Sequence, residues 1–82
     1  MRNINEYDVL IGNRLKEERL KRKMSLADVS KFFSVSRQTI FRWENGERGM
    51  SMEAFIKMLE FYGLEPNQFV KDIIAEADKK GL

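Results

Sequence analysis

Residues 25–46 read SLADVSKFFSVSRQTIFRWENG, and this stretch decides the fold. It holds two short segments of helical periodicity separated by a connection of three residues. Ser25 and Ser36 each precede one segment and are good N-cap residues. We therefore expect one helix to end near Phe33 and the next to span Arg37 to about Asn45. Two short helices so joined are typical of a helix-turn-helix motif.

The rest of the chain also has helical periodicity, and no segment alternates at period two. The expected flanking helices run from about Glu6 to Lys23, from a Ser51 cap to a Gly63 stop, and from Pro66 towards frayed residues Lys79 to Leu82. The predicted fold class is all-α, a compact five-helix bundle. We expect one domain over residues 1–82, with its core at about 6–78.

The amino-acid composition argues against several classes of function. The 82 residues are 43% hydrophobic and include no cysteine and no histidine, which argues against thiolate or imidazole metal sites and against catalysis that needs a histidine base. We expect no enzyme activity, no metal and no cofactor. No apolar run is long enough for a membrane span or a signal peptide, so we expect a cytoplasmic location.

Charge is distributed unevenly along the chain. The net charge is +2. Residues 13–48 hold ten basic and five acidic residues and carry +5, residues 49–82 hold four basic and six acidic ones and carry −2, and residues 1–12 carry the remaining −1. The first half favours a polyanionic partner, although a solvated helix surface would carry the same charge.

The helix expected from Arg37 to Asn45 has two faces when its residues are spaced at about 100°. Thr39, Ile40, Trp43 and Glu44 form the packing side, and Arg37, Gln38, Phe41, Arg42 and Asn45 form the outward side. An arginine fork matches guanine and a glutamine amide matches adenine in the major groove of DNA. We therefore expect Arg37, Gln38 and Arg42 to read bases, and Asn45 to bind phosphate. Alternatively, these polar residues only solvate an exposed helix.

Two residues of the motif region and one of the first helix do not suit their positions. Phe41 is apolar on the outward face, so we expect it to contact a thymine methyl, a neighbouring side chain of the domain or another protein. Glu44 lies on the packing side, where a carboxylate needs a cation. Arg19 lies in an apolar stripe of the first helix and is the expected partner in a structural ion pair.

The stretch Ser25 to Gly46 resembles the helix-turn-helix of the lambda-repressor-like family, also called the XRE family of bacterial and phage regulators. The likeness is carried by VSRQTI at 35–40 and WENG at 43–46. It extends from about Ile11 to Phe69 through the GxxL pattern of Gly12 and Leu15, Arg19, and LEPNQF at 64–69. The resemblance implies that Arg37, Gln38 and Arg42 read bases. It also implies that Ser36, Asn45 and the loop around Arg48 touch the DNA backbone.

The chain departs from the family pattern at four positions. Leu26 stands where many relatives have a phosphate-binding Gln, and Phe41 where the residue is usually small and polar. Ser30 and Ser34 replace a small Ala and a turn Gly, and Ser34 is expected to carry some strain if its backbone is left-handed.

These observations predict a sequence-specific transcriptional regulator, a repressor, that binds an operator in double-stranded DNA through the helix beginning at Arg37. The last helix carries more apolar residues than the core requires. We therefore expect a homodimer interface formed by Val70, Ile74 and Ala77, with a wider intramolecular core as the alternative. The rival function is a protein-interaction module, coactivator-like or antitoxin-like, which Leu26 and Phe41 favour. An enzyme is the weakest reading because no catalytic base or phosphate-binding glycine loop is present.

Overall fold

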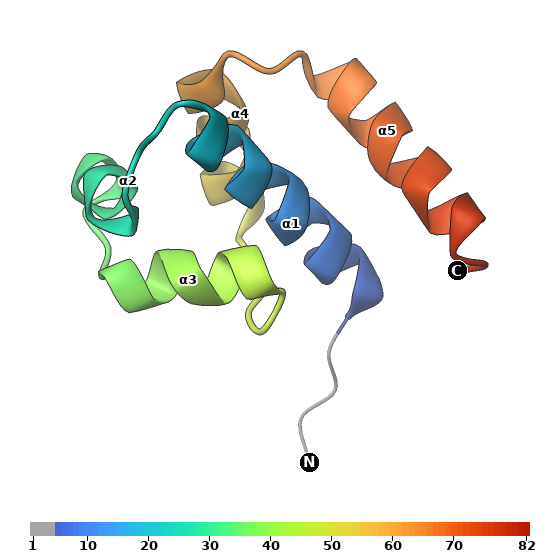
Figure 1. Cartoon of the computed structure of the whole chain (residues 1–82), viewed down its shortest axis with the longest axis horizontal. Helices are drawn as coiled ribbons and strands as arrows, with labels where there is room; N and C mark the ends of the chain where they lie inside the picture. The colour runs from blue at the N-terminus through green and yellow to red at the C-terminus, as the bar shows by residue number, and fades with distance from the viewer. Residues whose placement is uncertain (1–4) are drawn as a thin grey trace. The chain divides into compact units, whose positions relative to one another are not determined.

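A computed structural model describes residues 5–82, and all regular structure within that range is helical (Figure 1). The elements are α1 (Glu6–Lys21), α2 (Leu26–Phe33), α3 (Arg37–Asn45), α4 (Met52–Tyr62) and α5 (Pro66–Lys79). The chain divides into two units, Met1–Gly49 and Met50–Leu82. The predicted all-α class is confirmed, and so is the placement of a helix-turn-helix in α2 and α3.

In the first unit, α1 and α2 both pack against α3. Figure 1 shows α2 nearly end-on and α3 along its length, so the two helices cross at a steep angle. Leu15, Val29, Ile40 and Trp43 are buried. Gly12 permits the approach of α1 to α3, because a Cβ there would lie 2.6 Å from the carbonyl oxygen of Glu44.

A buried ion pair joins α1 to α3. Arg19 donates from Nε to Glu44 Oε2 at 2.8 Å and from Nη2 to Oε1 at 2.9 Å. Its Nη1 donates to the carbonyl oxygen of Met24 at 2.9 Å. Arg19 is 7% exposed and Glu44 is 3% exposed, so both charges are largely removed from water. One guanidinium therefore ties together α1, the connection that follows it and α3.

The turn between α2 and α3 depends on local hydrogen bonds. Ser25 and Asp28 form a capping box at the start of α2, and the Ser36 hydroxyl accepts from the Thr39 amide at the start of α3. Between them, Ser34 has φ 55° and ψ 40°, which is the left-handed region. The strain expected of a serine in place of glycine is therefore present in the turn.

The second unit contains α4 and α5. Ser51 caps α4, Gly63 ends it, and Glu65 caps α5 with Pro66 in its first turn. The rings of Phe55 and Phe69 meet edge to face with centroids 5.6 Å apart, which brings the start of α4 against α5.

Two expectations, one about a helix end and one about a surface, are corrected. α1 ends at Lys21 rather than Lys23, because Lys23 has φ 56° and leaves the helical region. α5 reaches Lys79, and the amide of Leu82 donates to the carbonyl oxygen of Ala77 at 2.9 Å. Ala77 was expected in a dimer interface, but it is 1% exposed, so its methyl belongs to the intramolecular core instead.

Glu44→Ala is expected to lower the free energy of unfolding by about 3–5 kcal/mol, because it leaves the Arg19 guanidinium buried without its partner. Chemical denaturation followed by circular dichroism measures the change. The double variant Arg19→Met with Glu44→Leu is the control, and it should lose much less because no uncompensated charge remains. Equal losses in the two variants would contradict this account of the pair.

Ser34→Gly is expected to stabilise the protein by about 1 kcal/mol, because glycine adopts the left-handed conformation without steric cost. Thermal unfolding should show a rise in Tm of about 4–8 °C. Ser51→Gly is the matched control, since Ser51 has φ −65° and its hydroxyl caps α4. That variant should lose a few tenths of a kcal/mol. A lower Tm for Ser34→Gly would show that the turn is not strained.

Candidate nucleic-acid interface

The outward face of α3 carries long polar side chains. Arg37, Gln38 and Phe41 are exposed, and Arg42 and Asn45 are partly exposed. Within residues 5–82, no ion pair or side-chain hydrogen bond engages Arg37, Gln38 or Arg42. Their donors and acceptors are therefore available to a ligand.

Most of the opposite face of the same helix is used for packing, although Thr39 on that face is partly exposed. Ile40 is 0% exposed, Trp43 is 8% exposed and Glu44 forms the pair with Arg19. A helix fixed so firmly on one side presents its other side at a defined angle. The structure thus brings Arg37, Gln38 and Arg42 together on one surface, as the helical wheel indicates.

The residues expected to touch a DNA backbone lie at the two ends of α3. Ser36 is exposed, but its hydroxyl already accepts from the Thr39 amide at 3.1 Å and shares a hydrogen bond of 2.9 Å with the Thr39 hydroxyl. Asn45 donates from Nδ2 to a Glu47 carboxylate oxygen at 3.4 Å, and Arg48 is exposed in the loop beyond. Arg48 therefore offers the most accessible donors of the three.

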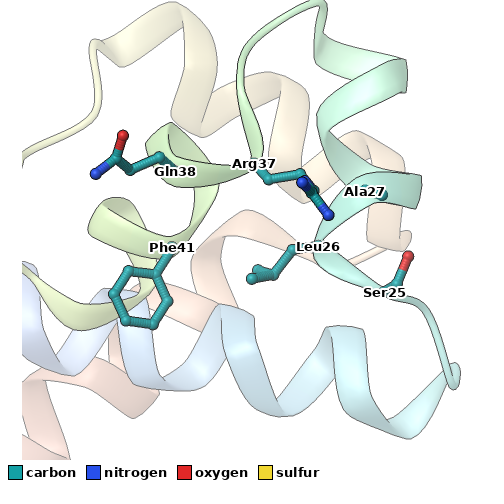
Figure 2. Close-up of a pocket in the computed structure, with 6 residues that line it drawn as sticks. All are labelled: Ser25, Leu26, Ala27, Arg37, Gln38 and Phe41. Atoms are coloured by element: carbon teal, nitrogen blue, oxygen red, sulfur yellow. The ribbon is translucent and has the colours of Figure 1, made fainter.

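A shallow hollow lies between the first turn of α2 and the start of α3 (Figure 2). Its lining residues are Ser25, Leu26, Ala27, Arg37, Gln38 and Phe41. Figure 2 shows Leu26 pointing towards Phe41, Arg37 reaching across to the first turn of α2, and Gln38 pointing away from it. Leu26 and Phe41 each stood out in the sequence as unusual, but their separation of fifteen residues gave no sign that they share a surface.

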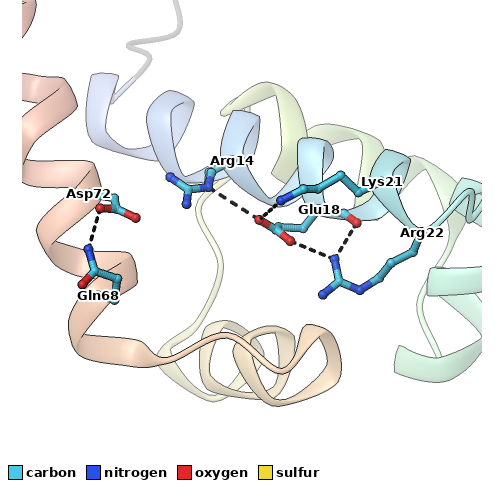
Figure 3. Close-up of polar contacts among 6 residues, drawn as sticks. All are labelled: Arg14, Glu18, Lys21, Arg22, Gln68 and Asp72. Atoms are coloured by element: carbon cyan, nitrogen blue, oxygen red, sulfur yellow. Dashed lines mark hydrogen bonds and ion pairs between the residues drawn. The ribbon is translucent and has the colours of Figure 1, made fainter.

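Glu18 is surrounded by three basic side chains, a cluster that was not predicted from the sequence (Figure 3). It is 4% exposed and accepts from Arg22 at 2.8 Å and Lys21 at 3.3 Å, with Arg14 at 3.6 Å. The hydrogen bond from Arg22 is the main cause that lowers the pKa of Glu18, and it outweighs desolvation, which raises it. These cations lie three or four residues from Glu18 along the helix, and this spacing in the sequence could have predicted the ion pairs. Glu18 therefore offsets part of the positive charge of α1.

Asp28 holds the start of α2 through its carboxylate. It accepts from the Ser25 amide at 2.9 Å, and its own amide donates to the Ser25 hydroxyl at 3.0 Å. The hydrogen bond from the Ser25 backbone is the main cause that lowers the pKa of Asp28. The Asp28 carboxylate is thus committed to the cap.

Two kinds of feature are not found in the part of the chain that the structure describes. None of the helices there combines the length and the apolar character that crossing a bilayer requires. Residues 5–82 also contain no group of three or more acidic, cysteine or histidine side chains placed to hold a metal ion.

Comparison with known proteins gives a family and several relatives. The family model described as Helix-turn-helix matches residues 15–69. Relatives named as HTH-type transcriptional regulatory proteins occur in Saccharolobus islandicus (strain L.S.2.15) and Saccharolobus solfataricus, each 32% identical over 65 residues, which is 79% of this chain and 20% of the relative. A protein of the same name in Methanococcus vannielii is 40% identical over 50 residues, 61% of this chain and 15% of the relative. No solved structure matches significantly.

The chain spans about one fifth of the length of the curated relatives that it matches over 65 residues. The family match covers α2, α3 and α4 entirely, together with most of the residues singled out above. On this match, and on the helix-turn-helix geometry of α2 and α3, the chain belongs to the helix-turn-helix family of the XRE, or lambda-repressor-like, type, a family of DNA-binding regulators rather than enzymes.

Proposed function

We propose that this chain binds a specific operator sequence in duplex DNA by placing α3 in the major groove, and that it regulates transcription as a repressor. The observation that carries the proposal is the outward face of α3, where Arg37, Gln38 and Arg42 have no partner within residues 5–82. An α-helix fits the major groove, and arginine and glutamine side chains match guanine and adenine edges there. The regulatory names of the relatives support the same role.

Each residue of the surface has a separate part in this proposal. Arg37, Gln38 and Arg42 read bases, while Ser36, Asn45 and Arg48 bind the phosphate backbone. The exposure of Arg48 supports a phosphate contact, because an arginine there reaches outward from the loop after α3. Phosphate contacts fix the register of the helix, and base contacts supply the sequence preference.

We also propose that both units act as one DNA-binding domain, as the single family match across residues 15–69 supports. A homodimer would place two copies of α3 in successive major grooves about 34 Å apart. Val70 and Ile74 remain the proposed interface on α5, since they are 45% and 52% exposed. The proposed location is the cytoplasm.

A protein-interaction module is the second candidate, and one observation favours it. Leu26 and Phe41 make the surface around α3 more apolar than a phosphate-binding surface needs to be. A module of this kind would bind its partner with little dependence on DNA. Titration with duplex DNA at two salt concentrations separates the two candidates.

Binding to the operator is expected to weaken steeply with salt. A protein that makes about six to ten phosphate contacts loses roughly 10³- to 10⁵-fold in affinity between 50 and 200 mM salt. The measurement is fluorescence anisotropy with a duplex selected from a random pool. Binding that is absent, or that does not respond to salt, would refute the proposed function and favour the interaction module.

Arg42→Ala is expected to cost about 1–3 kcal/mol at the selected operator and to relax the preference at one base pair, because it removes a forked donor from a base edge. The matched control is Arg48→Ala, which should weaken binding to all sequences alike and reduce the salt dependence. Repeating the selection with each variant measures both effects. A uniform loss for Arg42→Ala would assign that residue to the phosphate backbone instead.

A further inference from the structure

The hollow between α2 and α3 has an apolar centre and a polar edge. Leu26 and Ala27, both partly exposed, and Phe41, which is 47% exposed, supply the apolar surface. Arg37 and Gln38 stand at its edge, on the α3 side (Figure 2). A group that enters the hollow therefore meets carbon atoms first and hydrogen-bonding groups beside them.

The Ser25 hydroxyl at the α2 end of the hollow is already engaged, and so is the Asp28 carboxylate next to it. The Ser25 hydroxyl accepts from the Asp28 amide at 3.0 Å, and the Asp28 carboxylate accepts from the Ser25 amide at 2.9 Å. The side chains of Leu26, Ala27 and Phe41 make the centre of the hollow better suited to an apolar group than to a phosphate oxygen.

The charge around the hollow favours a nucleic acid over a protein side chain as its occupant. Arg37 lies directly at the edge, and Arg42 lies on the same outward face of α3. A duplex that brings base edges to these two arginines also presents the neighbouring base edges to the hollow. The thymine 5-methyl group is the one apolar group among the base edges of the unmodified major groove.

We propose that Leu26 and Phe41 together form a receptor for the 5-methyl group of one thymine in each operator half-site. This inference rests on the proposed function and adds a determinant of specificity to it. Enclosing the methyl removes apolar surface of the base and of the exposed phenyl ring from water at the same time. Arg37 and Gln38 then read the base edges beside that thymine.

The test replaces thymine by deoxyuridine, because this change removes the methyl group and keeps every hydrogen-bonding atom of the base. The full 82-residue chain first selects its operator from a random duplex pool. Each thymine of a half-site is then replaced singly, and the dissociation constant is measured. We expect one position to weaken about fourfold, the ratio that corresponds to one buried methyl group.

Variants assign that effect to the hollow. In Phe41→Ala and in Leu26→Ala, thymine and deoxyuridine duplexes should bind equally at the sensitive position. Phe32→Ala is the matched control, because Phe32 is a phenylalanine of α2 that is 58% exposed and lies outside the hollow. It should keep the fourfold ratio.

The outcomes separate this inference from the function on which it rests. Tight, salt-dependent binding with no thymine position sensitive to deoxyuridine overturns the methyl receptor and leaves operator binding intact. A sensitive position that persists in both Leu26→Ala and Phe41→Ala overturns it too, since another residue then holds the methyl. Failure to select any duplex overturns the proposed function and the receptor together.

Discussion

The buried pair of Arg19 and Glu44 is the interaction on which the rest of the first unit depends. Removing two charges from water is costly, and the structure offsets this with a bidentate contact at 2.8 and 2.9 Å and a third bond to the Met24 carbonyl oxygen. Because Glu44 belongs to α3 and Arg19 to α1, these bonds resist both rotation of α3 about its axis and its separation from α1. The direction of the outward side chains follows from that restraint.

A single helix of nine residues can pack through one face and present polar side chains on the other, because its period separates the residues into two faces. Ile40, Trp43 and Glu44 are buried, and Arg37 and Gln38 are exposed on the other side. A shift of one residue in the buried set would turn an arginine inward and a tryptophan outward. The packing of the helix and its readout are therefore one constraint, and a change on the buried side alters the angle at which the arginines meet a ligand.

The sequence predicted those parts of the structure that depend on local chemistry. Ser25, Ser36 and Ser51 marked helix starts because each hydroxyl accepts from an amide a few residues ahead. Arg19 and Glu44 could be matched since each was a charge in an apolar stripe. The hollow that Leu26 and Phe41 both line could not be predicted, because it depends on where α2 lies against α3. Periodicity gives a residue's face but not the neighbours of that face.

Within the proposed function, Leu26 and Phe41 place apolar side chains at positions where polar ones could contact DNA. This changes how much of the affinity comes from phosphate contacts and how much from base contacts. A phosphate contact at the start of α2 would strengthen binding to every sequence equally, because all duplexes carry the same backbone. Leu26 cannot make such a contact, so non-specific binding is weaker than it would be with a polar side chain there. An apolar contact from Leu26 and Phe41 to a base edge adds free energy only at sequences that carry the matching methyl. The apolar side chains of Leu26 and Phe41 thus lower the total attraction to DNA but widen the difference in affinity between the operator and other sequences. A regulator depends on that difference when competing sites are in great excess.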